Sequence, residues 1–396
     1  MPTTADRPNR HELIRRHNES LVLHHVGQAT VPVSRVVLAE LTGLSRPTVN
    51  LLVDDLCESG LLREAGLRTG ALGRPASLVE VNPRYGVVAA IAVDPTGIAT
   101  MVCDLVGEVL AETRIPLPRR GPLVPAVASE IGRALTAAGV TDGTVLSYCI
   151  SEPGVSAGQG LPRSLAPNVP VLDDAALAQL LASRDGSPVH FENDVNLAAI
   201  GEQRFGAAQG EPSFAFLLVD AGVGMGLMVK GELLRGTHGA AGEAGYLPIG
   251  EGPFTGRAAR VGALETAAGR AGFLSHFRRL SGVKRVSLET VWERAASADA
   301  AALRAIQDEA ELISRAVLAT VALLDPAFVV LGGAIGAHPE IVARVQGRIG
   351  VIAPYATQVR ASALGDRAPL LGAAATALDI ARQTLGLPVD VPPPVG

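Results

Sequence analysis

The segment between residues 34 and 60 constrains the fold of this chain most. Ser34 precedes a short apolar-periodic run that ends at Gly43, and Ser45 precedes a second run that ends before Gly60. A serine hydroxyl can accept an unpaired backbone N–H at the start of a helix, and glycine readily adopts the positive φ of a tight turn. The pattern therefore predicts two short helices joined by a turn, which is a helix-turn-helix.

The second helix of this pair has an apolar and a polar face. The apolar stripe consists of Val49, Leu52, Val53 and Leu56. Pro47 falls in the first turn, where a helix needs no backbone N–H donor. The polar face presents Ser45, Arg46, Thr48 and Asn50. Because arginine can bind guanine and asparagine can bind adenine in the major groove, we predict that these four residues contact DNA.

Flanking segments complete a winged helix-turn-helix. A supporting helix is predicted over Arg10–Val26, where the helical spacing is carried by Leu13, Ile14, His17, Leu21 and His25. Two wing strands are predicted at Leu61–Ala65 and Ser77–Val81, on either side of a glycine-rich run. Arg74 in that run is a candidate for a minor-groove or phosphate contact. The alternative is a small helical domain whose polar face is only solvated.

Composition limits the class of protein. The 396 residues leave room for two or three domains, and the formal net charge is −5. Cys57, Cys103 and Cys149 lie far apart, so they predict neither a zinc site nor a disulfide framework. The N-terminus lacks the apolar core of a signal peptide, and no apolar run reaches membrane-spanning length. A cytoplasmic protein is expected.

A different pattern begins near Gly86. Apolar strands are predicted at Gly86–Val93, Ile98–Asp104, Glu108–Ile115, Val145–Ile150, Phe214–Val219, Leu227–Val229 and Phe328–Leu331, with helices between several of them. The glycines Gly222, Gly224 and Gly226 follow one strand and suit either a ligand-binding turn or only a tight hairpin. Strands that end at such turns beside helices predict a cleft between two α/β lobes. The tail Leu387–Gly396, which is rich in proline, is predicted to be disordered.

Several motifs together resemble the ROK family (repressors, open reading frames and kinases) of the actin-like ATPase fold. Besides the glycine turn, they are Glu152-Pro153-Gly154-Val155, Ala166-Pro167-Asn168-Val169-Pro170, Glu192-Asn193-Asp194-Val195-Asn196, Gly201-Glu202, Gly231-Glu232-Leu233, Gly239-Ala240-Ala241-Gly242-Glu243-Ala244-Gly245, Leu331-Gly332-Gly333 and Leu371-Gly372-Ala373-Ala374. The expected fold class is α/β, with an N-terminal winged helix-turn-helix at 1–82. A two-lobed actin-like ATPase (ROK sugar-kinase-like) domain follows at 83–386, and the tail occupies 387–396.

The resemblance implies a sugar site. By matching motifs, the sugar contacts are Asn168, Asn193, Asp194, Glu243 and Glu265, with Tyr246 beside them. Carboxylates and carboxamides suit this task because they can bridge neighbouring hydroxyls. In the ROK kinases, the residue that matches Asp194 is the general base for the accepting hydroxyl. Singly, each residue also fits a plainer role, such as a helix cap, a turn or an ion pair with arginine.

The chain departs from the kinases of this family at three places. The first hairpin reads Asp94-Pro95-Thr96-Gly97-Ile98 in place of Asp-x-Gly-x-Thr, and Pro95 lacks an N–H that could hold phosphate. The second phosphate turn has Ala221 where a threonine is common. The positions of a His and three Cys zinc ligands are Tyr246, Gly256, Ala258 and Ala263, none of which suits zinc. The expectation is neither ATP nor zinc, and no phosphoryl transfer.

The resulting hypothesis is a cytoplasmic, sugar-responsive transcriptional regulator, more specifically a repressor, that binds double-stranded DNA as a homodimer or tetramer. The kinase-like part would then serve as a ligand sensor. One alternative is a bifunctional ATP-dependent sugar kinase, which Asp194 favours and the altered hairpin opposes. Another is an interaction protein that binds DNA or a protein partner without any small ligand.

Overall fold

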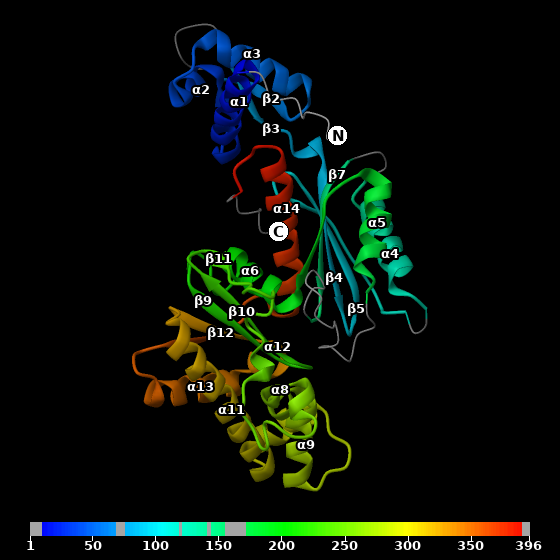
Figure 1. The fold of residues 1–396 in the computed structure, drawn as a ribbon, viewed down its shortest axis with the longest axis vertical. Coiled ribbons are helices and arrows are strands. Elements are labelled where there is room, and N and C mark those ends of the chain that lie inside the picture. The colour runs from blue at the N-terminus through cyan, green and yellow to red at the C-terminus, as the bar shows by residue number, and fades with distance from the viewer. Residues whose placement is uncertain (1–9, 69–75, 119–120, 141–143, 155–171, 390–396) are drawn as a thin grey trace, which may run out of the picture.

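The computed structural model places a small N-terminal head at one end of two α/β lobes (Figure 1). It describes residues 10–68, 76–118, 121–140, 144–154 and 172–389. The head comprises residues 10–81, the first lobe contains the sheet that follows it, and the second lobe contains the sheet built after residue 213. The last helix runs back toward the head (Figure 1).

The head contains the predicted helix-turn-helix. Its helices are α1 (Arg10–Gln28), α2 (Arg35–Thr42) and α3 (Arg46–Glu58), and its strands are β1 (Val33–Ser34), β2 (Leu62–Arg68) and β3 (Ala76–Val81), in the order β1-β3-β2. The Ser34 hydroxyl accepts the Val37 N–H, and the Ser45 hydroxyl accepts the Thr48 N–H, each at 3.3 Å. Gly43 ends α2 with a φ of 69°. These caps and the turn confirm the sequence-based prediction.

The core of the head confirms the predicted apolar face of α3 but differs from the one predicted for the supporting helix α1. The α3 stripe Val49, Leu52, Val53 and Leu56 is buried, as expected. The supporting helix forms, but Leu13 and Ile14 are 53% and 49% exposed. Its buried residues are instead Val22, Leu23, Val26 and Gly27. Helical spacing alone does not reveal that the buried residues of α1 all lie in its C-terminal half.

The first lobe is built on a five-stranded sheet of order β6-β5-β4-β7-β8. Its strands are β4 (Val87–Asp94), β5 (Gly97–Asp104), β6 (Val109–Ile115), β7 (Val145–Glu152) and β8 (Val189–Asn193). Strands β4, β5 and β6 pair antiparallel, and β7 and β8 continue in parallel from β4. Helices α4 (Leu123–Ala137) and α5 (Asp174–Asp185) contribute to the apolar core on one face. The carboxyl ends of β4 and β8 point toward the second lobe, where they can carry ligand-binding residues.

The second lobe repeats this plan with the order β11-β10-β9-β12-β13. Its strands are β9 (Phe214–Val219), β10 (Val223–Val229), β11 (Glu232–Leu233), β12 (Phe328–Gly332) and β13 (Gln358–Ala361). One face packs on α6 (Asp194–Phe205). The other packs on the helices α8 (Ala263–Ala268), α9 (Arg270–Ser281), α10 (Leu288–Ala296), α11 (Ala300–Leu324), α12 (Gly333–Gly336) and α13 (Pro339–Ile352). The short helix α7 (Ala258–Val261) precedes them.

The glycine run after β9 forms a tight hairpin, which is one of the two alternatives that the sequence allowed. Strand β10 starts at Val223, whose partner is Val219, so Gly224 and Gly226 lie inside a strand rather than in a turn. The predicted strand at Leu227–Val229 was therefore too short. A Cβ on Gly224 would lie 2.9 Å from Val195 Cγ2, and one on Gly226 would lie 2.8 Å from the Val195 carbonyl oxygen. These glycines allow α6 to lie close against the sheet.

The last helix, α14 (Ala368–Thr384), lies along the sheet of the first lobe and extends toward the head (Figure 1). It packs along α6 through two glycines. A Cβ on Gly372 would lie 1.8 Å from the Leu197 carbonyl oxygen, and one on Gly201 would lie 2.4 Å from the Ala368 carbonyl oxygen. Because both contacts involve backbone atoms, no side chain at either glycine fits without moving a helix.

The start of the predicted disordered tail is instead ordered. Leu387 is only 3% exposed and belongs to the apolar cluster that contains Leu23 and Val26 of the head. Pro388 lies directly against Gly27, because a Cβ on that glycine would approach Pro388 Cδ to 2.5 Å. Proline content alone does not reveal the burial of Leu387. Residues 390–396 lie outside the described part.

Within the described ranges, no single helix has the length and apolar composition needed to cross a membrane. Together, α2 and α3 meet that test by length and composition alone, although they are bent by 117° with respect to each other.

Candidate functional site

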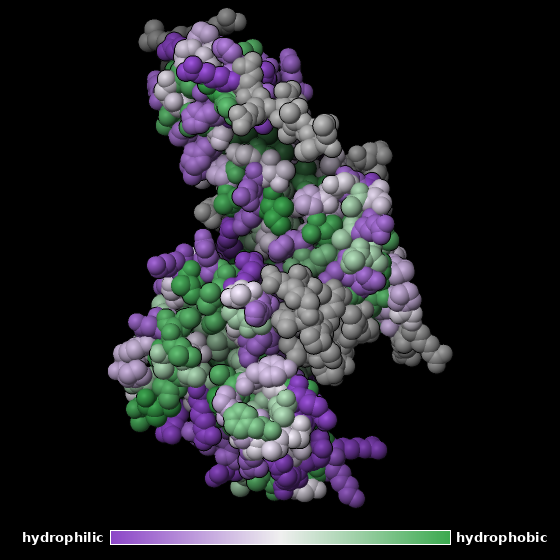
Figure 2. All heavy atoms as spheres, in the orientation of Figure 1, coloured by the Kyte–Doolittle hydropathy of each residue, from purple (hydrophilic) through white to green (hydrophobic). Residues whose placement is uncertain are grey.

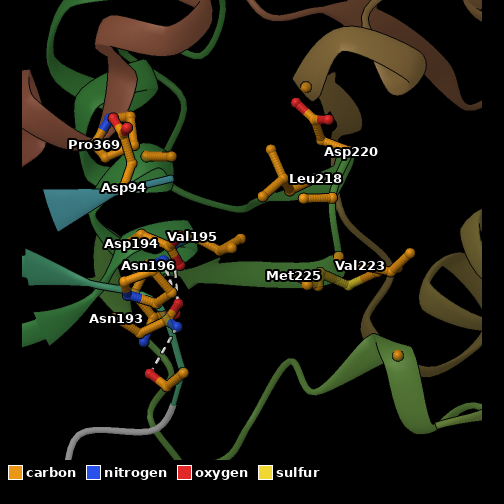
Figure 3. A pocket seen from close by; sticks show the side chains of 18 of the residues that line it. Asp94, Asn193, Asp194, Val195, Asn196, Leu218, Asp220, Val223, Met225 and Pro369 are labelled. Carbon is orange, nitrogen blue, oxygen red and sulfur yellow. Dashed lines mark hydrogen bonds between the residues drawn. The ribbon is translucent and has the colours of Figure 1, made fainter. Parts of the chain in front are cut away.

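A cavity of about 440 Å³ lies between the two lobes. Its walls come from the β4–β5 turn, the β8–α6 junction, the β9–β10 hairpin, residues 239–246, α8 and the start of α14. Figure 3 shows Asp94, Asp194 and Pro369 on one wall, and Leu218 and Asp220 on the facing wall. Polar groups from both lobes thus converge on one cleft, as expected for a small-molecule site.

The cleft brings together five of the six predicted sugar contacts. Asn193, Asp194, Glu243, Tyr246 and Glu265 all line it, although they come from three separate segments of the chain. Asn168 lies outside the described residues. The β8–α6 junction carries the first two, the short 3-10 helix at Ala244–Tyr246 and the residue before it carry the next two, and α8 carries Glu265.

Asn193 acts as the cap of α6. Its Oδ1 accepts the backbone N–H groups of Val195 at 2.9 Å and Asn196 at 3.1 Å, and its Nδ2 donates to the Gly154 carbonyl oxygen at 3.0 Å. The plainer role considered for this residue is therefore realised. By capping the helix, Asn193 also determines where α6 begins and places Asp194 at the cleft.

Asp194 retains much of its acceptor capacity for a ligand. Its Oδ1 accepts the Val195 N–H at 2.8 Å, and the described residues offer its carboxyl no ion pair. Burial raises its pKa to about 7; the Val195 N–H opposes this effect, and the charges of Glu243 and Asp94 add to it. Near neutral pH this carboxyl can therefore either donate to or accept from a ligand hydroxyl.

Glu243 and Glu265 place two more carboxyls in the cleft. Burial raises the pKa of Glu243, and the charge of Glu265 raises it further. Burial also raises the pKa of Glu265, against the opposing effect of the Val223 N–H, which donates to Glu265 Oε2 at 3.3 Å. Neighbouring carboxyls suit a polyhydroxyl ligand, because adjacent hydroxyls can donate to different carboxylate oxygens.

Tyr246 is 43% exposed, and its hydroxyl donates to the Arg260 carbonyl oxygen at 3.3 Å. Burial and the charges of Glu243 and Glu265 raise the pKa of this phenol, so it stays protonated at neutral pH. Its oxygen can still accept a hydrogen bond.

The four residues that the resemblance places at zinc positions do not suit the metal. Tyr246, Gly256, Ala258 and Ala263 offer no nitrogen or thiolate ligand. In the part of the chain that the structure describes, no three His, Cys, Asp or Glu side chains are grouped in a way that suits a metal ion.

The β4–β5 hairpin directs its donors inward. Asp94 pairs with Gly97 in the strand register, which leaves a two-residue turn. Asp94 Oδ1 accepts the N–H groups of Thr96 at 2.7 Å and Gly97 at 3.0 Å, and both Asp94 oxygens accept from Arg114. The backbone donors that would hold a phosphate are thus bound to a carboxylate of the same hairpin.

A second ion pair lies on the facing wall. Arg270 pairs with Asp220, and Asp220 Oδ2 accepts the Ala334 N–H at 3.3 Å. The sequence analysis missed Arg114 and Arg270 because they lie 20 and 50 residues from their partners. No local motif signals either arginine.

The head exposes part of the predicted DNA-contacting face. Ser45 and Thr48 bind each other within the cap, with 2.8 Å between their hydroxyl oxygens. Arg46 and Asn50 are exposed on the first turns of α3, and hydrophilic side chains are abundant on the face of the head in Figure 2. Arg74 lies outside the described residues.

Sequence reasoning also missed Arg35. This residue forms an ion pair with Asp54 at 2.6 Å and donates to the Asn50 carbonyl oxygen at 3.3 Å. It thereby fixes α2 against α3, although no motif marks it in the sequence.

Residues 88–380 match the model of the ROK family. The chain belongs to the ROK family. It is 28% identical to a putative xylose repressor of Caldicellulosiruptor sp. (strain Rt8B.4), over 92% of this chain and 96% of that protein. It is 24% identical to the xylose repressor of Bacillus subtilis (strain 168), again over 92% of this chain and 96% of that protein.

Solved structures agree with the fold. A ROK family transcriptional regulator described as a homolog of the E. coli MLC protein superposes with a TM-score of 0.74 and 22% identity, covering 94% of this chain and 98% of that one. The ROK hexokinase of Thermus thermophilus superposes with a TM-score of 0.63 and 30% identity, covering 74% and 97%. The family model begins at residue 88, so it excludes the winged head.

Proposed function

We propose that this chain is a sugar-responsive, DNA-binding transcriptional repressor. The observation that carries the proposal is the joining of two parts in one chain. One is a winged helix-turn-helix whose α3 exposes Arg46 and Asn50, and the other is a ROK cleft into which Asp194, Glu243 and Glu265 bring their carboxyls. The similarity to the named xylose repressors supports it, because it extends over 92% of the chain and so includes the head.

The ligand we propose is a neutral monosaccharide. Asp194, Glu243 and Glu265 supply acceptors for several hydroxyls, and their mutual repulsion disfavours an anionic ligand. Xylose is the first candidate, since relatives that match nearly the whole chain are named xylose repressors.

We further propose that the cleft performs no phosphoryl transfer. Asp94 already binds the N–H groups of Thr96 and Gly97, and Pro95 has no N–H, so the hairpin offers few backbone donors to a nucleotide phosphate. Catalysis of that reaction depends on positioned phosphates and Mg²⁺, so a raised pKa at Asp194 does not by itself make a kinase. Sugar-dependent ADP release above that of Asp194→Asn would contradict this part of the proposal.

The proposed assembly is a cytoplasmic homodimer on a two-part operator. One α3 helix reaches only a few base pairs, and two copies of a helix-turn-helix bind half-sites about one helical turn apart. Sedimentation of the protein on operator DNA would give the stoichiometry, and a single bound copy would contradict a dimer.

Fluorescence anisotropy tests the function. The full chain is titrated onto DNA from its own upstream region, with and without each member of a panel of pentoses, hexoses and amino sugars. We expect one neutral sugar to change the DNA affinity at least fivefold, and Glu243→Gln to weaken that response. Tight DNA binding that no sugar alters would contradict the sensor and favour the ligand-independent alternative.

A further inference from the structure

Arg382 is a buried arginine near the end of α14, with only 1% of its surface exposed. Its guanidinium donates three hydrogen bonds, all to backbone carbonyl oxygens: Nη2 to Gly27 at 3.1 Å, Nη1 to Leu105 at 3.0 Å and Nε to Pro388 at 2.6 Å. Arg382 belongs neither to the cleft nor to the predicted DNA-contacting face, so neither site explains it.

The three acceptors belong to three different parts of the molecule. Gly27 lies in the last turn of α1 in the head, Leu105 lies between β5 and β6 in the first lobe, and Pro388 lies in the C-terminal segment. The carbonyls at the end of a helix have no partner within it and carry partial negative charge, so a cation there is favourable. Arg382 therefore caps a helix of the head from within the ROK domain.

Burying a guanidinium is unfavourable unless its donors are satisfied. Burial lowers the pKa of Arg382, because the charged guanidinium is removed from water. If the head moved away, the bond to Gly27 would be lost, and a buried donor and a helix-end carbonyl would both need new partners. These hydrogen bonds thus favour the observed position of the head on α14 over displaced positions.

Close packing reinforces this position. A Cβ on Gly27 would lie 2.5 Å from Pro388 Cδ, and Leu387 is buried in the same apolar cluster as Leu23 and Val26. The segment after α14 therefore packs tightly against α1, and Arg382 hydrogen-bonds to both this segment and α1.

The other end of α14 lies at the cleft. Pro369, in the first turn of the helix, lines the cavity beside Asp94 (Figure 3). Gly372 places the helix in backbone contact with α6, which begins at Asp194. Helix α14 thus contacts the cleft and α6 near its start, packs on the sheet of the first lobe, and contacts the head near its end.

We propose that Arg382 is the positioning residue that seats the head on α14 and thereby couples the cleft to DNA binding. This inference rests on the proposed function. Arginine suits the role because its planar group presents several donors in a fixed geometry, so that one side chain can hold three chain segments together.

The test compares Arg382→Gln with Arg360→Gln in the full chain. Arg360 is a matched control, because its guanidinium lies 3.6 Å from the centre of the Phe328 ring and donates to the Ala207 carbonyl oxygen at 3.1 Å, both away from the head. Hydrogen–deuterium exchange of residues 20–28 is measured without sugar. We expect at least tenfold faster exchange there in Arg382→Gln and no change in Arg360→Gln.

The second readout is the ratio of DNA dissociation constants with and without the panel sugar that shifts the wild type. We expect this ratio to fall toward one in Arg382→Gln, while calorimetry gives a sugar affinity within twofold of the wild type. A purely structural role would leave the ratio unchanged. Equal exchange of residues 20–28 in the two variants, or a wild-type ratio in Arg382→Gln, would overturn the inference.

Two further outcomes are separable. If no sugar shifts the wild type, the proposed function fails, and the exchange experiment alone still decides whether Arg382 seats the head. If Arg382→Gln does not fold, Gly27→Ala replaces it, because its methyl group would collide with Pro388. Faster exchange of residues 20–28 is expected in that variant, and unchanged exchange would overturn the inference.

Discussion

At the scale of single residues, two neighbours in one motif have different tasks. The side-chain oxygen and nitrogen of Asn193 hydrogen-bond to backbone groups, and this cap determines where α6 starts. Asp194 then faces the cleft with a pKa raised by burial. The sequence placed both in a sugar site, and both do line the cleft, but only hydrogen-bond partners distinguish a cap from a carboxyl available to a ligand.

We expect ionised Asp194 to lower the stability of the folded protein while it contributes to sugar binding. Its ordinary pKa is near 3.8 and burial raises it to about 7, so ionisation destabilises the folded state progressively between those pH values and fully above them. We expect Asp194→Asn to increase the free energy of unfolding by about 1–3 kcal/mol at pH 8 and by almost nothing at pH 4, while weakening sugar binding. Urea denaturation at both pH values measures this, and an equal gain at pH 4 would contradict the assignment.

Two exposed residues of α3 should carry DNA specificity. Arg46→Ala or Asn50→Ala is expected to cost about 1–3 kcal/mol of binding free energy at the specific site, with little effect on stability because neither side chain is buried. Glu58→Gln, at the other end of the same helix, is the control. Anisotropy with operator and scrambled DNA gives the energies, and unchanged operator affinity in both alanine variants would refute this placement.

At the scale of elements, glycines set how closely helices lie on their neighbours. Gly224 and Gly226 admit α6 onto β10, and Gly201 and Gly372 admit α14 onto α6. None of these four has the positive φ that glycine alone tolerates readily. Their common property is the absence of a side chain at a backbone contact.

Gly372→Ala should therefore destabilise the protein by about 1–3 kcal/mol or more, because its methyl group would lie 1.8 Å from the Leu197 carbonyl oxygen. Gly347→Ala is a matched control within a helix, since a Cβ there meets no atom within 4 Å. The control should gain about 0.5–1 kcal/mol from helix propensity. Thermal unfolding of both variants distinguishes the cases, and a stable Gly372→Ala would contradict the tight α6–α14 contact.

Sequence patterns predicted the elements that depend on local chemistry. Ser34, Ser45 and Gly43 marked helix ends, and apolar runs marked most strands of both sheets. The patterns failed where distant segments decide the outcome. Leu13 is 53% exposed because the described residues do not bury its side chain, and Leu387 is buried because it packs in the apolar cluster of the head.

The same limit applied to the cleft. Family resemblance identified Glu243 and Glu265, but the ion pairs Arg114–Asp94 and Arg270–Asp220 join residues that no local pattern connects. They become visible only when both lobes are folded.

At the scale of the whole molecule, one chain joins a DNA-contacting head to a two-lobed cleft. Helix α14 extends from the lobes toward the head (Figure 1). Pro369 lines the cleft, and Arg382 donates to the Gly27 carbonyl oxygen in α1. A ligand changes DNA binding only if it binds the two conformations of the protein with different affinities. The proposed repressor therefore requires that sugar and DNA favour different positions of the lobes or of the head.

Reciprocal titration tests the central claim most directly. The dissociation constant of upstream DNA is measured with and without saturating sugar, and that of the sugar with and without saturating DNA, with xylose first. Thermodynamic linkage predicts that each ligand weakens the other by the same factor, which we expect to be at least fivefold. Two independent dissociation constants, with a factor of one for every sugar in the panel, would contradict the account of this chain as a sugar-responsive repressor.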